Sequence, residues 1–171
     1  AIILLSLITN SLDIEKKFYT VLFLSVLLGS LVGFLIWNWH PAKIFLGDVG
    51  SIPIGFIFGW VVFELSNYGL WHVSILLPMY YFLDASITLI YRIIKKEKIF
   101  IAHKTHFYQK ATKNLKHSTI VISISLLNIL LIGLSIFGLV NPDMRNVYIS
   151  LGIFFTLITI YIFHKAFERK Y

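Results

Sequence analysis

The chain has 171 residues, of which 58% are hydrophobic and only 13% are charged, about half the charged share of ordinary soluble domains. This composition excludes a typical water-soluble globular domain, and the absence of cysteine excludes a disulfide framework and thiolate metal sites. The 15 Lys and Arg against 8 Asp and Glu do not indicate a nucleic-acid partner here, because basic loops orient membrane proteins.

Long apolar runs predict an all-α, polytopic transmembrane helix bundle. Residues 18–39 and 118–140 contain no charged side chain, and each run exceeds the roughly 20 residues that cross hydrocarbon as a helix. We expect about five full spans and one partial span at the N-terminus. In chain order, the partial span lies near 1–10 and the full spans near 18–37, 52–70, 72–94, 118–140 and 146–164.

The first residues, from Ala1, are apolar but too few to cross a bilayer. We therefore interpret 1–171 as a single bundle fragment, the C-terminal part of a longer protein.

The loops divide the basic residues unevenly. The loops near 38–51 and 95–117, with their bordering residues and the tail after His164, hold twelve Lys and Arg, whereas the opposite side holds three. Because cytoplasmic loops carry the excess of basic residues, we expect both loops to face the cytoplasm. The two spans between them would form a hairpin that can bring the loops together.

The first of these loops contains one carboxylate, Asp48, between Gly47 and Gly50. Glycines let the backbone turn tightly and let a ligand approach closely. Ser51 followed by Pro53 predicts a helix N-cap with proline in the first turn, which would place Asp48 just before a helix. A lone carboxylate with room for water and phosphate oxygens suits Mg²⁺. The alternative is a tight turn in which Asp48 only caps the following helix.

Asp84 lies in the expected span 72–94, about two helical turns, or roughly 12 Å, before Arg92. Ionisable groups at that depth are costly and usually face the bundle interior. Asp84, Thr88 and Arg92 are spaced four residues apart and so share one helix face. We favour an internal ion pair or hydrogen bond that positions the helix, and direct contact with a substrate stays open.

The second loop contains His103 and His106 on either side of Lys104. Zinc is disfavoured because no third ligand stands nearby. A cluster of Lys and His suits an anionic ligand such as a diphosphate. The alternative is a basic loop that is attracted to anionic lipid headgroups, which accounts less well for the adjoining Tyr108 and Gln109.

These motifs resemble the polyprenyl-phosphate N-acetylhexosamine-1-phosphate transferases, also called glycosyltransferase family 4. Phe45–Ser51, Phe-Leu-Gly-Asp-Val-Gly-Ser, is similar to the family signature Phe-Met-Gly-Asp-x-Gly-Ser. Asp84 matches an aspartate of a following span, and His103–Gln109 is similar to the family motif His-Arg-x-His-x-Tyr-Gln. The three motifs occur in the family's order, with the expected spans between them.

The resemblance implies transfer of an N-acetylhexosamine 1-phosphate from a UDP-amino sugar to polyprenyl (undecaprenyl) phosphate, with UMP as the second product. It implies Mg²⁺ as cofactor, with Mn²⁺ as the alternative ion, and a multi-pass protein of the bacterial cytoplasmic (inner) membrane whose site faces the cytoplasm. A homodimer is compatible with it. The His-x-x-His-Phe-Tyr-Gln form favours initiation of O-antigen-like polysaccharides over peptidoglycan.

The resemblance also implies roles for single residues. Asp48 is expected to bind Mg²⁺, and Asp48, Lys104 and His106 are expected to be catalytic. Contact with substrate is expected for Asn38, Lys43, Gly47, Gly50, Ser51, Asp84, His103, Tyr108 and Gln109.

The sequence departs from the family pattern at several places. Leu46 replaces the usual Met, His40 stands where Pro is frequent, and Lys104 replaces Arg, which loses bidentate geometry. The family's adjacent aspartate pair and its Asp-Gly-containing loop are absent from this sequence. Both normally precede the Asp48 motif, so we expect them before Ala1 and expect the fragment alone to be inactive.

Two other classes remain as alternatives. A transporter would show paired half-helices in two repeats, and the sequence shows none. A non-catalytic membrane scaffold with a basic, lipid-binding cytoplasmic loop would leave Asp48 dispensable.

Overall fold

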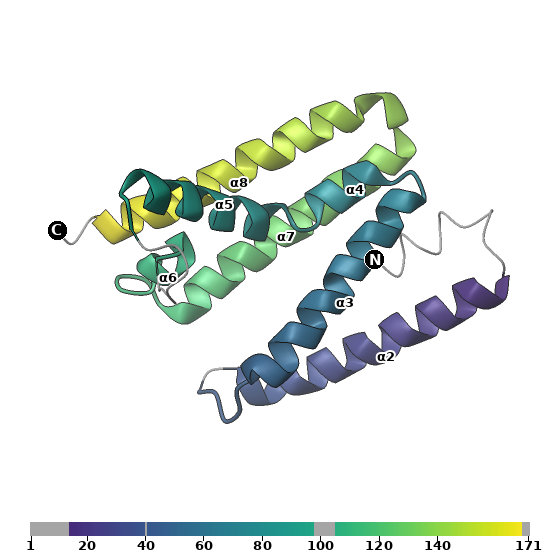
Figure 1. Ribbon diagram of the computed structural model, residues 1–171, viewed down its shortest axis with the longest axis horizontal. Coiled ribbons are helices and arrows are strands. Elements are labelled where there is room, and N and C mark those ends of the chain that lie inside the picture. The colour runs from purple at the N-terminus through teal and green to yellow at the C-terminus, as the bar shows by residue number, and fades with distance from the viewer. Residues whose placement is uncertain (1–13, 40, 98–104, 169–171) are drawn as a thin grey trace. The chain divides into compact units, whose positions relative to one another are not determined.

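The computed structural model describes residues 14–39, 41–97 and 105–168, and over these ranges every regular element is a helix (Figure 1). This confirms the predicted all-α class. The elements are α2 (Ile14–Asn38), α3 (Gly47–Asn67), α4 (Trp71–Leu76), α5 (Met79–Ile94), α6 (Phe107–Ala111), α7 (His117–Val140), the 3-10 helix η1 (Pro142–Met144) and α8 (Arg145–Glu168).

Within the described ranges, four helical segments are long and apolar enough to cross a membrane. They are Phe18–Asn38, Gly47–Asn67, His117–Val140 and Pro142–Glu168. These correspond to four of the five predicted full spans and confirm a multi-pass helical membrane protein. The predicted partial span near 1–10 lies outside the described residues.

The prediction of one continuous span over 72–94 is wrong, because the structure divides this stretch into α4 and α5. The break falls at Leu77 and Pro78. Proline has no N–H to donate to the carbonyl of Ser74, and its ring clashes with that carbonyl in a regular helix. The chain therefore ends α4 before Pro78 and begins α5 directly after it.

The chain forms two compact units, residues 1–71 and 72–171. In the first unit the segment between α2 and α3 folds back on the end of α2. The Asn38 side-chain amide donates to the Ile44 carbonyl at 2.8 Å, and the Lys43 N–H donates to the Trp37 carbonyl at 2.9 Å. The Lys43 ammonium also lies 5.3 Å from the centre of the Trp37 ring. These contacts hold the segment that leads into α3.

In the second unit α7 and α8 form an antiparallel hairpin through η1 (Figure 1). Helices α5 and α6 both pack on α8. Apolar side chains from α4 to α8 bury one core against this hairpin. Its members are Leu76, Met79, Tyr80, Ala111, Ile120, Leu127, Leu131, Ile160 and Phe163.

Two glycines allow close packing in this unit. A Cβ atom on Gly152 of α8 would lie 2.5 Å from Leu76 Cδ2 and 3.2 Å from Met79 Sδ, so side chains on both sides of the helix break pack against this glycine. A Cβ atom on Gly138, near the end of α7, would lie 2.7 Å from Cδ2 of the buried His72. Small residues are common where helices of membrane bundles contact one another, because they let the helices approach closely. Here they fix the start and the end of α4 on the hairpin.

Candidate functional site

Helix α3 begins at Gly47, so the prediction that Ser51 caps the helix is wrong. Leu46 is the N-cap residue, Asp48 lies in the first turn, and Pro53 lies inside the helix. Gly47 has a φ of 60°, a left-handed conformation that glycine adopts without steric cost, and this turns the chain into the helix before Ser51. Asp48 is therefore presented by a helix and not by the preceding loop.

The Asp48 carboxylate is exposed and makes no hydrogen bond or ion pair within the described part of the chain. A negative side chain in the first turn is favoured by the helix dipole. The structure shows no side-chain cap bond at the start of α3, so Asp48 does not act as the cap that the alternative interpretation required.

The surroundings of Asp48 decide what it could bind. Over the described ranges no three His, Asp or Glu side chains gather as metal ligands. Glu64, the other carboxylate of this unit whose side chain is described, lies near the opposite end of α3, about 24 Å away along the helix axis. Asp48 can thus offer a cation one carboxylate, with water or phosphate oxygens completing the shell. Mg²⁺ accepts such an arrangement, so the residues present fit this ion.

The other candidates of the first unit have local roles. Asn38 and Lys43 close the segment before α3, as described above. A Cβ atom on Gly50 would lie 2.5 Å from Leu46 Cδ1, so the Leu46 side chain folds over this glycine. Ser51 is exposed on α3, one turn after Gly47. Asn38 and Lys43 thus hold the segment before the turn that carries Asp48, and Gly50 packs against Leu46.

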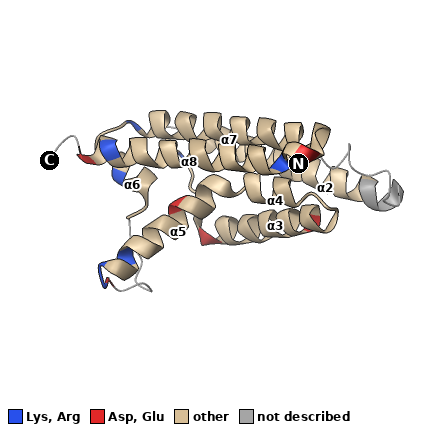
Figure 2. Cartoon of the chain, turned by 90° about the horizontal axis from the view of Figure 1, so that it is seen from above, with Lys and Arg blue, Asp and Glu red and all other residues tan. Residues whose placement is uncertain are grey.

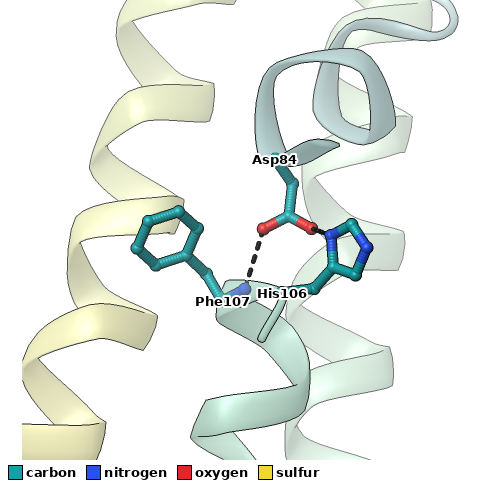
Figure 3. A network of polar contacts seen from close by, with 3 residues as sticks. All are labelled: Asp84, His106 and Phe107. Atoms are coloured by element: carbon teal, nitrogen blue, oxygen red, sulfur yellow. Dashed lines mark hydrogen bonds and ion pairs between the residues drawn. The ribbon is translucent and has the colours of Figure 1, made fainter. Parts of the chain in front are cut away.

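Asp84 of α5 is only 3% exposed and joins α5 to the start of α6 (Figure 3). Its Oδ2 lies 2.9 Å from His106 Nδ1, and its Oδ1 accepts a hydrogen bond of 3.0 Å from the Phe107 N–H. These bonds link residues 22 and 23 positions apart. The interpretation of Asp84 as a residue that makes an internal hydrogen bond is confirmed.

The predicted polar face of α5 is also confirmed. Asp84, Thr88 and Arg92 are all buried, with exposed fractions of 3%, 2% and 5%. Arg92 does not pair with Asp84: its Nε lies 3.2 Å from Glu97 Oε2, just beyond the end of α5.

Helix α6 carries the described part of the second loop motif. The rings of His106 and Tyr108 are stacked, with centroids 5.8 Å apart and planes inclined by 24°. Burial raises the pKa of the Tyr108 phenol, and the negative charge of Asp84 adds to the shift. Gln109 accepts a hydrogen bond of 2.7 Å from Thr112 Oγ1 through its main-chain carbonyl. His103 and Lys104 lie outside the described residues.

The segment after α6 is fixed to the end of α8. The Asn114 side-chain amide donates to the carbonyls of Ala166 and Phe167 at 2.9 and 3.0 Å. The rings of Phe107 and His164 pack edge to face, with their centroids 5.8 Å apart. Asn114 and the Phe107 N–H were not among the residues predicted from the sequence. An amide side chain close to the end of an expected span is the signal that could have found Asn114, since helix ends leave carbonyls without partners.

Basic residues of the second unit gather at the α6 end of the hairpin (Figure 2). Lys110 is on α6, Lys113 and Lys116 follow it, and Lys165 is in the last turn of α8. Arg145, by contrast, begins α8 at the opposite end. The Lys110 ammonium lies 5.3 Å from the centre of the Tyr91 ring. Lys110 thus brings a positive charge to the short helix that follows His106.

Residues 1–66 match the family described as glycosyl transferase family 4. The chain is 33% identical over 142 residues to a "probable undecaprenyl-phosphate N-acetylglucosaminyl 1-phosphate transferase" of Bacillus subtilis (strain 168). The aligned residues cover 78% of this chain and 37% of that protein. It is 35% identical over 89 residues to a "phospho-N-acetylmuramoyl-pentapeptide-transferase" of Streptococcus uberis, which covers 51% of this chain and 26% of that protein. The chain thus spans less than half the length of these curated relatives. No solved structure matches it.

Proposed function

We propose that this chain, which belongs to glycosyl transferase family 4, is part of a membrane enzyme that transfers a sugar 1-phosphate to a lipid phosphate. The donor is a UDP-linked N-acetylhexosamine, and the acceptor is undecaprenyl phosphate. The observation that carries the proposal is the family match of residues 1–66, because this stretch contains the helix turn that presents Asp48.

The reaction is a phosphoryl substitution without a change of oxidation state. An oxygen of the acceptor phosphate bonds to the phosphorus that carries the sugar, and the bond from that phosphorus to the UMP oxygen breaks. The electron pair of the broken bond leaves with UMP, and the other product is the lipid diphosphate sugar. Such transfers depend mainly on positioning and charge neutralisation.

Asp48 and His106 have the central roles in this proposal. Asp48 would hold Mg²⁺, and the ion when bound would neutralise charge on the phosphate oxygens. The exposed Asp48 carboxylate supports this role, because it is not engaged by a partner within the described ranges. His106 would contact the diphosphate, with Lys104 beside it in sequence and Tyr108 stacked on its ring.

The proposed site faces the cytoplasm of a bacterium, at its inner membrane. The basic side chains at the α6 end of the second unit support this orientation, because cytoplasmic ends of membrane helices carry the excess of Lys and Arg. The nucleotide sugar then arrives from the aqueous side and the lipid acceptor from the bilayer. The His-x-x-His-Phe-Tyr-Gln form of the loop favours a pathway of the O-antigen type.

The test uses the full-length protein, reconstituted with undecaprenyl phosphate and Mg²⁺. UDP-N-acetylglucosamine and related UDP-amino sugars are supplied one at a time, and the release of UMP is followed. We expect release that requires both the lipid phosphate and one of these sugars. A protein that releases no UMP from any of them is not this transferase, and a lipid-binding scaffold would behave in that way.

A further inference from the structure

Both oxygens of the buried Asp84 carboxylate are used by two consecutive residues at the start of α6. The His106 ring nitrogen Nδ1 and the Phe107 N–H lie 2.9 and 3.0 Å from them. A buried carboxylate is costly unless hydrogen bonds satisfy it. The two bonds therefore explain how Asp84 is tolerated in this core, and they leave the carboxylate with its oxygens directed at protein groups.

We propose that Asp84 is a positioning residue, which holds the His106 imidazole with Nδ1–H toward α5 and presents Nε2 to the ligand. The identity of that ligand, a diphosphate, rests on the proposed function. The positioning itself rests on the contacts of α5 and α6. Asp84 then lies behind His106 and does not contact substrate.

The chemistry of the pair fixes which ring nitrogen faces outward. An ionised Asp84 can only accept hydrogen bonds, so the ring nitrogen that lies against the ionised carboxylate carries a proton. With Nδ1 committed to Asp84, the imidazole can meet a ligand through Nε2, which accepts in the neutral ring and donates in the charged ring. Figure 3 shows this second nitrogen on the side of the ring away from Asp84, with the Phe107 ring turned toward α8.

A positioning role requires that Asp84 be buried and that His106 remain accessible to a ligand. The Asp84 side chain is 4% exposed, whereas the His106 side chain is 28% exposed. A buried carboxylate that orients a reachable histidine is a recurrent arrangement, and the carboxylate sets the tautomer and the ring angle. Stacking on Tyr108 restrains the same ring from a second direction.

The first test does not depend on activity. The full-length protein in lipid nanodiscs, with ring nitrogens of histidine labelled with ¹⁵N, is compared with Asp84→Asn and with Thr88→Val as the control. His106 is assigned by the signal that disappears in His106→Asn. Thr88 is one turn further along the same buried face, so its loss perturbs α5 without touching the pair.

We expect the neutral His106 ring of the unchanged protein to carry its proton on Nδ1. Asparagine can satisfy only one of the two donors that Asp84 satisfies, because its amide has one acceptor oxygen. In Asp84→Asn the signal should therefore shift toward the Nε2–H tautomer, and in Thr88→Val it should not. A wild-type ring with no proton on Nδ1, or a signal unmoved by Asp84→Asn, overturns the proposal, and the wild-type measurement decides even if the variant fails to fold.

The second test is a double-mutant cycle in the UMP-release assay. His106→Asn keeps an amide that can donate to Asp84 but has no counterpart of Nε2. We expect Asp84→Asn alone to lower kcat by about 10- to 100-fold, the size of the loss seen when the group that orients a metal-bound histidine is removed. In the His106→Asn background, Asp84→Asn should lower kcat little further, because the imidazole that Asp84 positions is already absent.

The double-mutant cycle also distinguishes positioning of His106 from an independent effect of Asp84 on the reaction. Losses that multiply in the double variant would show that Asp84 acts independently of His106, and they would overturn the proposal. A full-length protein without any transferase activity would refute the proposed function, while the ¹⁵N measurement would still decide whether Asp84 orients His106.

Discussion

The side-chain amide of Asn114 donates to the main-chain carbonyl of Ala166 at 2.9 Å, across 52 positions of the sequence. One hydrogen bond thus joins the segment after α6 to the last turn of α8. A second bond from the same nitrogen to the next carbonyl strengthens the link. The position of α6, and of His106 before it, depends on this attachment as well as on Asp84.

Replacement of Asn114 should loosen α6. Asn114→Ala removes two hydrogen bonds to carbonyls at the end of α8, and we expect a loss of about 1–2 kcal/mol in the free energy of unfolding. Thermal unfolding in detergent measures the loss, and faster amide hydrogen exchange in α6 locates it. Asn114→Asp keeps the shape but cannot donate, so it should be equally harmful. Lys116→Ala, an exposed change nearby, serves as the control, and an equal effect of the two alanine variants would contradict the role of Asn114.

Replacement of Asp48 should remove Mg²⁺-dependent turnover from the full-length protein. We expect Asp48→Asn to lower kcat by at least about 100-fold, the effect of losing a group that stabilises developing charge. Folding should change little, because the carboxylate is exposed and has no partner in the described ranges. The matched control is Glu64→Gln, near the other end of α3, and UMP release is measured over a range of Mg²⁺ concentrations. Activity that survives Asp48→Asn would take this residue out of the site.

Replacement of Gly152 tests the packing around the helix break. The added methyl group of Gly152→Ala would meet Leu76, Leu131 and Met79 at 2.5 to 3.2 Å, so we expect destabilisation of about 1–3 kcal/mol. Gly133→Ala on α7 is the control, because a Cβ there has no neighbour within 4 Å and alanine is the better helix former. A lower melting temperature for the first variant only is the expected result. Equal melting temperatures would mean that α4 and α5 do not pack on Gly152 as described.

Replacement of Gly47 tests the conformation that starts α3. Any residue with a Cβ is strained at a φ of 60°, and Gly47→Ala should cost about 1–2 kcal/mol. Because Asp48 follows directly, the same change should also lower activity of the full-length protein. Gly55→Ala, in the interior of α3 with open space around its Cβ, should leave both properties unchanged. An active, fully stable Gly47→Ala variant would show that the positive φ is not needed.

The membrane-spanning helices were largely predictable because length and apolar composition are properties of the sequence itself. The run 118–140 corresponds to α7 within a residue at its start. The break at Pro78 was not predicted, because proline is tolerated in membrane helices where neighbours compensate for the lost bond. Whether the helix bends or breaks depends on contacts such as that of Leu76 with Gly152, which only the folded chain contains.

The candidate site was predictable in part. The four-residue spacing of Asp84, Thr88 and Arg92 predicts their common buried face, since it follows from helix geometry. The partner of Asp84 was not predictable, because it depends on the path of the chain between α5 and α6. Likewise the Ser51–Pro53 pattern indicates a helix start, but the helix begins earlier, at Gly47, whose φ is positive. The sign of a backbone φ angle cannot be inferred from a local residue pattern.

Because the chain is interrupted between α4 and α5, a change of angle at Pro78 would move the whole of α5. Asp84 lies about 9 Å along the helix axis from Pro78, so a tilt of about 10° at the break would move its carboxylate by about 1.5 Å. His106 and Phe107 are tied to that carboxylate and would follow it. Phosphoryl chemistry tolerates such displacements poorly, since about 1 Å can cost 100-fold in rate. A change in the angle between α4 and α5 would therefore move His106 together with Asp84.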